Sequence, residues 1–230
     1  MDQQLELANG YSRSHRLYEW GGIILGVSSA TTLGVRLASA DNLSGWWMPL
    51  ALFLGILGAD LTSGVVHWAC DTWGSVRTPI LGKLAIRTFR EHHVDDKAIT
   101  RHDFVETNGH NIALSLLPSV IGLFQLEHGT LRSTVVAMSL FSMALWVGMT
   151  SQIHKWAHQD QPPRVVRWLQ DSRMILAPHH HDVHHKAPHD SNYCITVGWL
   201  NGPFTAIGFF DKLERIITRV TGAKPRGEEL

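Results

Sequence analysis

The sequence predicts an all-α, multi-pass membrane protein with about four transmembrane helices and a cytosolic helical cap. Three observations lead to this prediction: apolar blocks alternate with polar segments, basic residues are unevenly distributed, and 15 histidines gather into short motifs within 230 residues. The overall hydrophobic content is only 44%, so the block arrangement indicates the membrane better than the composition does. The length suits one domain covering residues 1–230.

Four apolar blocks are the candidate spans. Residues 20–37 and 46–68 are each long enough for the roughly 20 helical residues that cross a hydrocarbon core. Residues 112–126 form a shorter block that contains Pro118, whereas residues 135–153 form a long one that is almost free of charge. We therefore expect the third and fourth blocks to form a hairpin that crosses the bilayer, or dips into it, as a unit.

The basic residues predict the orientation of these spans. If all four blocks cross the membrane, Arg36 and Arg132 are the only basic residues at the far side, and the other 18 of the 20 Lys and Arg lie on the N-terminal side. Cytosolic loops carry such an excess of basic residues, so we expect both termini in the cytosol. A soluble four-helix bundle, the alternative, has no reason to sort its charges in this way.

The remaining composition narrows the partners and the surface elements. The formal net charge is zero, which gives no reason to expect nucleic acid as a partner. The two cysteines are too few for a disulfide framework. Residues 162–176 and 199–220 mix apolar with basic side chains, as helices that lie on a membrane surface do.

Most of the histidines fall into four motifs, and this topology places the motifs in cytosolic segments 67–110 and 154–198. His67 with Asp71, and His154 with His158, are four residues apart and therefore share a helix face. The predicted metal ligands are His67, His92, His93, His154, His158, His181, His184 and His185. Clustered imidazoles repel one another when protonated and lose hydration when buried, and a shared metal ion removes both costs.

The number of histidines favours iron over zinc. A zinc site uses three or four ligands, whereas two iron ions with open positions for O2 would use about this many imidazoles. His102 and His180 are the next candidate ligands. Asp71, Asp103, Glu106 and Asp182 are expected to accept hydrogen bonds from the rings. Asp60, inside the second block, is expected to support or line the site, with a purely structural carboxylate as the alternative.

Longer strings around these histidines resemble the plasmanylethanolamine desaturase family, which includes the CarF-type lipid desaturases. The similar strings are GVVHW at 64–68, DTWGS at 71–75, FREHH at 89–93, TRHDF at 100–104, ETNG at 106–109, QIHKW at 152–156, YCIT at 193–196 and GWLN at 198–201. The resemblance covers roughly residues 59–225. One local departure is Asp96, in a loop where the family pattern has proline.

This resemblance implies a reaction and its cofactors. An oxidoreductase of this kind uses two Fe ions and O2 to remove two hydrogens from the 1-O-alkyl chain of an ether phospholipid, plasmanylethanolamine, and produces the vinyl ether of a plasmalogen. It takes electrons from an external protein such as cytochrome b5 or ferredoxin. The expected location is the endoplasmic reticulum membrane in a eukaryote or the inner membrane in a bacterium.

Three other functions are compatible with the same motifs. A related desaturase acting on a phosphatidylglycerol fatty acyl chain would share the metal site and differ only in its substrate. A membrane zinc hydrolase would hold one zinc ion and no iron. A non-catalytic metal carrier would bind the metal without changing the lipids of the cell.

Overall fold

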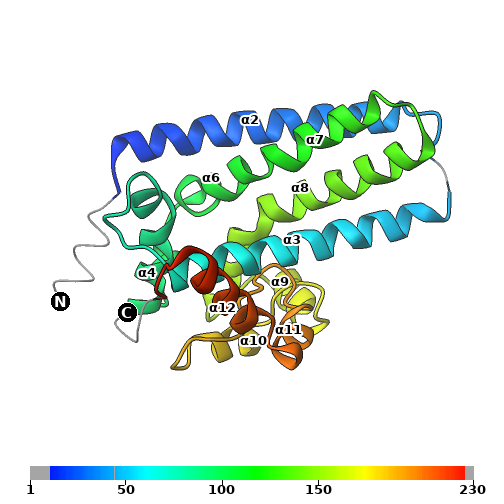
Figure 1. Ribbon diagram of the computed structural model, residues 1–230. Coiled ribbons are helices and arrows are strands. Elements are labelled where there is room, and N and C mark those ends of the chain that lie inside the picture. The colour runs from blue at the N-terminus through cyan, green and yellow to red at the C-terminus, as the bar shows by residue number, and fades with distance from the viewer. Residues whose placement is uncertain (1–10, 44, 226–230) are drawn as a thin grey trace.

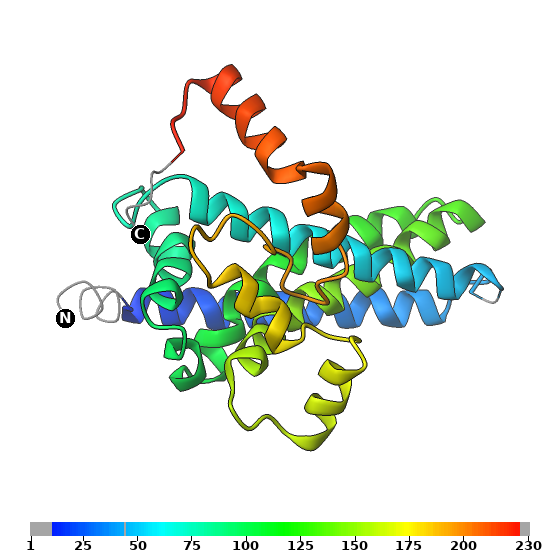
Figure 2. The ribbon, with the colours of Figure 1, turned by 90° about the horizontal axis from the view of Figure 1, so that it is seen from below.

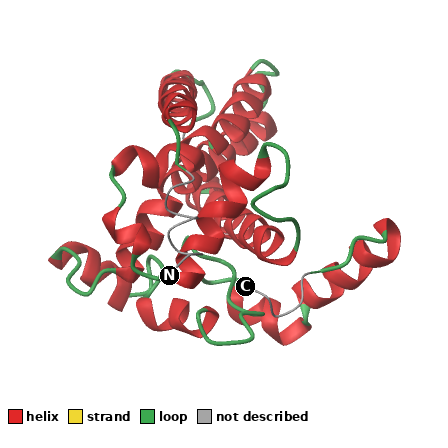
Figure 3. Ribbon diagram, turned by 90° about the vertical axis from the view of Figure 1, so that its left-hand side faces the viewer, coloured by secondary structure: helices red, strands yellow, loops and turns green. Residues whose placement is uncertain are grey.

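The computed structural model describes residues 11–43 and 45–225, and every regular element in these ranges is helical (Figure 3). The longest elements run side by side, and shorter helices gather at one end and along one flank of them (Figure 1). The prediction of an all-α chain is therefore confirmed.

Four long helical segments form an antiparallel bundle (Figure 1). They are α2 (Arg13–Ala38), α3 (Trp47–Thr72), the consecutive pair α6 (Phe104–Leu114) and α7 (Leu116–Leu126), and α8 (Leu131–His158). Each of the four segments is long and apolar enough to cross a membrane. The predicted number of spans is confirmed, but the helices extend beyond the apolar blocks because polar residues continue the helical hydrogen bonding at their ends.

The third segment differs most from the prediction. It begins at Phe104 rather than near Ile112, which gives a 23-residue helical segment of spanning length. Asp103 caps its start, since its side chain accepts the backbone N–H groups of Val105 and Glu106 at 3.0 Å. The interruption between α6 and α7 falls at Ser115, where Pro118 has no N–H to bond the carbonyl of Leu114.

The outer faces of these helices are apolar. Large exposed side chains include Leu25 on α2, Leu54 on α3, Leu117 on α7 and Leu145 on α8. In water such faces would drive aggregation, whereas lipid chains cover them at no cost. The exposure pattern therefore suits a bilayer rather than a soluble bundle.

Glycines bring α2 and α6 into close contact. A Cβ atom built at Gly26 would overlap the backbone carbonyl of Ile112, and one built at Gly22 would lie 2.6 Å from the Cβ of Ala113. Small residues at such positions let two membrane helices approach to backbone distance. Ala113, at this contact, also lines a cavity within the bundle.

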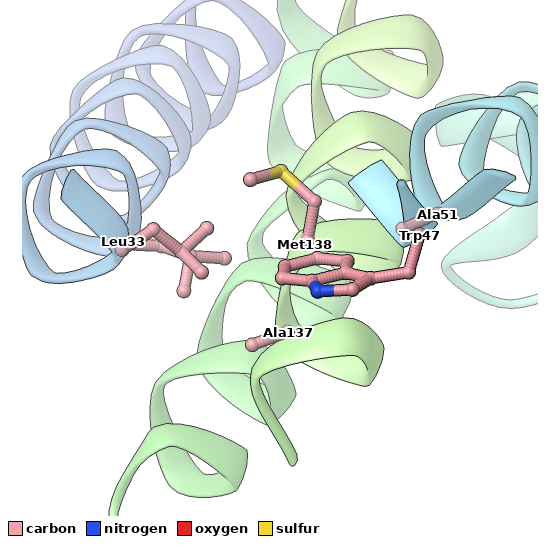
Figure 4. Close-up of a cluster of buried hydrophobic side chains, with 6 residues drawn as sticks. Leu33, Trp47, Ala51, Ala137 and Met138 are labelled. Atoms are coloured by element: carbon pink, nitrogen blue, oxygen red, sulfur yellow. The ribbon is translucent and has the colours of Figure 1, made fainter. Parts of the chain in front are cut away.

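A compact apolar core fixes the end of the bundle where α2 finishes and α3 begins. Leu33 of α2, Trp47 and Ala51 of α3, and Ala137 and Met138 of α8 pack together there (Figure 4). At the same end Arg36 pairs with Glu127 at 2.9 Å. These contacts join the consecutive helices α2 and α3 to α8, which lies far from them in the sequence.

Short helices occupy the other end and one flank of the bundle. They are the π-helical turn η1 (Gly82–Ile86), α4 (Arg87–Val94), α5 (Ala98–Arg101), α9 (Arg164–Asp171), α10 (Pro178–His184), α11 (Asn201–Ile207) and α12 (Phe209–Thr221). Seen from below, α9 and α12 project to opposite sides of the bundle (Figure 2). Both expose apolar side chains, Val165 and Trp168 on α9 and Ile216 and Val220 on α12, as expected for helices on a membrane surface.

The glycine contact leads to a prediction about stability. We expect Gly26→Ala to lower the free energy of unfolding by about 1–3 kcal/mol, because the added methyl group must push α2 away from the backbone of α6. Gly21→Ala is the matched control, since no atom of the described residues lies within 4 Å of a Cβ at that position, apart from its chain neighbours and the backbone of its own helix. Thermal unfolding of the detergent-purified variants measures the difference, and equal midpoints for the two variants would contradict this packing.

Candidate metal centre

Eight histidine rings meet where four helices converge. His67 comes from α3, His92 and His93 from α4, His154 and His158 from α8, and His181 and His184 from α10, with His185 at its C-cap. Their ring nitrogens form two groups, each with all ligand atoms within 4.8 Å of one another, and His92 belongs to both. The structure thus brings together all eight residues that the motif spacing identifies.

Local helix geometry explains why the rings converge. His154 and His158 are one turn apart at the end of α8, so both leave the same face. On α10, His181 is followed after three and four residues by His184 and His185, and Pro178 occupies the first turn, where a backbone N–H is not needed. Each helix therefore presents its histidines toward a common point.

The first group contains His92, His154, His158, His181 and His185. The Nε2 atom of His181 lies 2.8 Å from that of His154, 2.9 Å from that of His158 and 3.0 Å from that of His185. The Nε2 atoms of His154 and His158 are themselves 3.1 Å apart. Three of these nitrogens thus form a closed triangle of contacts.

Hydrogen bonds alone cannot satisfy this triangle. The Nε2 atom of an imidazole carries either a proton or a lone pair in the ring plane, so it acts as donor or as acceptor but not as both. Among three mutually facing Nε2 atoms, at least one contact must then join two donors or two acceptors. A cation that receives all three lone pairs removes this conflict.

The spacing also fits shared coordination. Two imidazole nitrogens about 2.1 Å from one ion and at right angles to each other lie about 3.0 Å apart. The observed Nε2 separations of 2.8 to 3.1 Å fall around this value. The donor set, five neutral nitrogens, is one that iron and related transition metals accept.

The second group contains His67, His92, His93 and His184, and Asp71 adds a carboxylate to it. The Oδ2 atom of Asp71 lies 3.3 Å from Nε2 of His67, 3.2 Å from Nε2 of His93 and 3.4 Å from Nε2 of His184. Because one oxygen faces three ring nitrogens, Asp71 suits a ligand position as well as the predicted role of hydrogen-bond acceptor.

Several buried ring nitrogens of the site make no hydrogen bond to the described residues. Two of them are Nε2 of His92 and Nε2 of His67, the latter having the 3.3 Å contact with Asp71. A buried polar nitrogen without a partner is costly. Both atoms lie within the second group, so a metal ion there would also satisfy them.

Backbone carbonyls orient two of the rings. The Nδ1 atom of His67 lies 3.2 Å from the carbonyl oxygen of Tyr193, and that of His184 lies 2.8 Å from the carbonyl oxygen of Ser191. A ring that donates its Nδ1–H to a carbonyl keeps the lone pair on Nε2, the atom that faces the group. These contacts therefore select the tautomer that can bind a metal.

Burial keeps the rings on and beside the short helices α4 and α10 neutral. Burial, together with the neighbouring imidazoles, lowers the pKa of His92 and of His181 well below the ordinary value. The same causes lower the pKa of His185 to about 2. Lone pairs are thus present on these rings at physiological pH, as metal ligation requires.

The two further candidate ligands, His102 and His180, lie outside both groups. His102 has its Nε2 atom 3.8 Å from Glu91 and 3.7 Å from Glu106, so it faces carboxylates rather than the other rings. His180 packs its ring against that of His179. The structure therefore does not support either residue as a ligand.

Three of the carboxylates expected beside the rings have other roles. Asp103 caps α6 and pairs with Arg16 at 2.7 Å, and Asp182 is exposed. Asp60 accepts only backbone N–H groups among its hydrogen bonds in the described residues and touches no ring of the two groups. Glu106 faces a histidine, but that histidine is His102. Asp71 alone of the five carboxylates touches the rings of the two groups.

Sequence reasoning missed the carbonyl groups of Ser191 and Tyr193. Every residue has a carbonyl, so no residue type marks these two positions. His189 is not among the predicted ligands, yet its Nδ1 atom lies 2.9 Å from the carbonyl oxygen of His184 and its ring is 5.0 Å from that of His93. His189 thus buttresses the second group from outside.

A cavity of about 420 Å³ reaches the site and is lined in part by His92 and His154. Glu91, His102 and Glu106 line it near the start of α6, whereas Leu114 and Val147 line it deeper in the bundle. The cavity wall is therefore mostly apolar but includes the carboxylates of Glu91 and Glu106 and two rings of the first group.

The chain matches known proteins over most of its length. The model of the lipid desaturase domain matches residues 56–228. Plasmanylethanolamine desaturase of Myxococcus xanthus is 48% identical over 97% of this chain and 79% of its own length. Plasmanylethanolamine desaturase 1 of mouse is 43% identical over 98% of this chain and 85% of its own length.

A plant protein is more distantly similar. Fatty acid desaturase 4, chloroplastic, of Arabidopsis thaliana is 33% identical over 93% of this chain and 64% of its own length. No solved structure matches the chain. The resemblance seen in the histidine motifs is confirmed by these matches, and the chain belongs to the lipid desaturase family.

Proposed function

We propose that this chain desaturates the 1-O-alkyl chain of an ether phospholipid to a vinyl ether, using two iron ions held by its histidines. The observation that carries the proposal is the pair of imidazole groups, whose facing nitrogens need a cation, beside a cavity whose lining is mostly apolar. The relatives named plasmanylethanolamine desaturase support the choice of substrate.

The depth of the site suits carbons next to a lipid headgroup. In α3, His67 follows Trp47 by 20 residues, which corresponds to about 30 Å of helix. That length equals the thickness of a typical hydrocarbon core. If α3 enters the bilayer near Trp47, His67 lies at the glycerol level of the opposite leaflet, where the first two carbons of an ether-linked chain lie.

The lining of the cavity suits the same lipid. The alkyl chain would lie toward Leu114 and Val147, and the glycerol and headgroup toward Glu91 and Glu106. The first carbons of the chain would then pass His92 and His154, which line the cavity between these ends. Val147 and Ile195 would exclude water from the reacting carbons.

The histidines and Asp71 would hold the metal ions. The first group, with His154, His158, His181 and His185, would hold one ion, and His67, His93, His184 and Asp71 the other, with His92 between them. When bound, the iron ions supply the O2 activation that cleavage of an unactivated C–H bond requires. The chain itself fixes the rings through the carbonyls of Ser191 and Tyr193 and supplies the dry channel.

The proposed reaction also requires an electron donor and a defined orientation of the chain in the membrane. Removal of two hydrogens with reduction of O2 to two water molecules consumes two electrons and two protons, so an external electron-transfer protein must dock. The unequal distribution of basic residues supports cytosolic termini and a cytosolic metal site, in the endoplasmic reticulum or the bacterial inner membrane.

A fatty acyl chain is the second candidate substrate, because the chain is also 33% identical to a plant fatty acid desaturase. A zinc hydrolase fits less well, since five nitrogens in one group exceed the four ligands of a zinc site. Metal and lipid analysis distinguish these possibilities.

Adjacent histidines give a sharp test of metal binding. His181→Ala should cost the purified chain about one of its two iron ions, because His181 contacts three other Nε2 atoms of the first group. His180→Ala, the matched control, should retain both ions because its ring lies against His179. Elemental analysis measures iron per chain, and an equal loss in both variants would contradict the grouping.

Activity is tested in cells that lack plasmalogens. Wild-type chain should produce vinyl ether lipid, and His184→Ala should reduce the yield by about 100-fold or more, since His184 belongs to the second group. His128→Ala is the control, because His128 is exposed in the turn after α7, at the far end of the bundle. Lipid mass spectrometry decides: vinyl ether in both variants would refute catalysis at this site, and new double bonds in fatty acyl chains would favour the second candidate.

The cavity predicts which substitutions obstruct the lipid. Val147→Phe should lower kcat/KM by about 10- to 200-fold while leaving the iron content unchanged, because the ring would fill part of the cavity. Leu145→Phe lies two residues away on the exposed face of α8 and should behave as wild type. Turnover by purified protein measures this, and an unaffected Val147→Phe enzyme would show that the chain does not use the cavity.

A further inference from the structure

Asp60 is fully buried in the middle of α3. Its Oδ1 atom accepts the backbone N–H groups of Val197 and Gly198, both at 2.9 Å, and its Oδ2 atom accepts that of Leu200 at 3.0 Å. A carboxylate inside a membrane span is costly and marks a functional requirement by default. All three of these hydrogen bonds of Asp60 come from a single stretch of irregular backbone.

That stretch, residues 193–201, is also fixed by other polar side chains of the bundle. Ser63 of α3 accepts the N–H of Ile195 at 3.0 Å, and the hydroxyl of Thr196 lies 2.7 Å from that of Thr150 on α8. Within the segment, the side chain of Asn201 bonds both the N–H and the carbonyl of Cys194 at 2.9 Å. The 193–201 segment is therefore held against the two helices that carry His67 and His154.

The 193–201 segment in turn contacts the metal centre. Its first residue, Tyr193, provides the carbonyl that receives Nδ1 of His67, and Ser191, two residues earlier, provides the one that receives Nδ1 of His184. His67 lies two helical turns beyond Asp60 on α3. One helix thus supplies both a ring and, through the 193–201 segment, the acceptor that orients the ring.

We propose that Asp60 is a positioning residue for the second histidine group. By anchoring the 193–201 segment, it holds the carbonyls of Tyr193 and Ser191 where they fix the rings of His67 and His184. This inference rests on the proposed metal binding. It adds a residue that influences the metal site without contacting any of the histidine rings.

The bonding pattern explains why the residue is a carboxylate. The three backbone groups are all donors, so both side-chain oxygens must accept. Asparagine has nearly the same shape but replaces one acceptor with an NH2 donor, which would face a backbone N–H. We therefore expect Asp60→Asn to release part of the segment without creating a cavity.

The test is anaerobic titration of the purified full-length chain with Fe2+. Asp60→Asn should weaken binding at the second group by about 10- to 100-fold, as loss of an orienting partner does, and should change the absorption and Mössbauer spectra of that ion. The first group should bind as in wild type. Ser142→Ala is the matched control, since it removes a buried hydrogen bond between α8 and Leu52 of α3 without touching the segment.

The outcomes separate this inference from the proposed function. Wild-type Fe2+ affinity and spectra in a folded Asp60→Asn chain would overturn the positioning role while leaving the desaturase proposal intact, and so would an equal loss in Ser142→Ala. Failure of the wild-type chain to bind Fe2+ would overturn both. If circular dichroism shows that Asp60→Asn is unfolded, Ser63→Ala decides instead, because it releases Ile195 of the same segment and should weaken the same ion.

Discussion

Three imidazole nitrogens that face one another cannot all be paired by hydrogen bonds, and the architecture around the site depends on this constraint. His154, His158 and His181 place their Nε2 atoms 2.8 to 3.1 Å apart in a buried space. Protonation of the rings would add repulsion, and burial already disfavours it for His181. Neutral rings with lone pairs aimed at one point remain, and a transition-metal ion is the partner that accepts several of them together.

The two ends of the bundle contribute differently to this arrangement: one end packs the helices together and the other carries the histidines. At one end Leu33, Trp47 and Met138 pack α2, α3 and α8 into a rigid apolar core. At the other end the same α3 and α8 carry His67, His154 and His158, and the short helices α4 and α10 complete the two groups. The apolar core fixes the spacing of α3 and α8, which carry three of the histidines. The rings can therefore be held together although burying neighbouring imidazoles is energetically unfavourable.

The spacing of residues in the sequence predicted most of the histidines of the site, but not how they divide into two groups. The four-residue spacing of His154 and His158 predicts a shared helix face, and the apolar blocks predict the spans that deliver both rings to one end. Which rings share a group depends on how α3, α4, α8 and α10 rotate against one another, and no local pattern encodes that. Asp103 and Asp60 lie near histidine motifs in the sequence, yet their oxygens accept backbone N–H groups. Because every residue except proline has an N–H group, the spacing of side chains does not predict such bonds.

Anomalous diffraction from crystals of the iron-loaded protein tests the central claim most directly. Data collected at the iron absorption edge should give two peaks in the anomalous difference map. One peak is expected among His154, His158, His181 and His185, and the other among His67, His93, His184 and Asp71. A single peak, or a peak beside His102 or His180, would contradict the account.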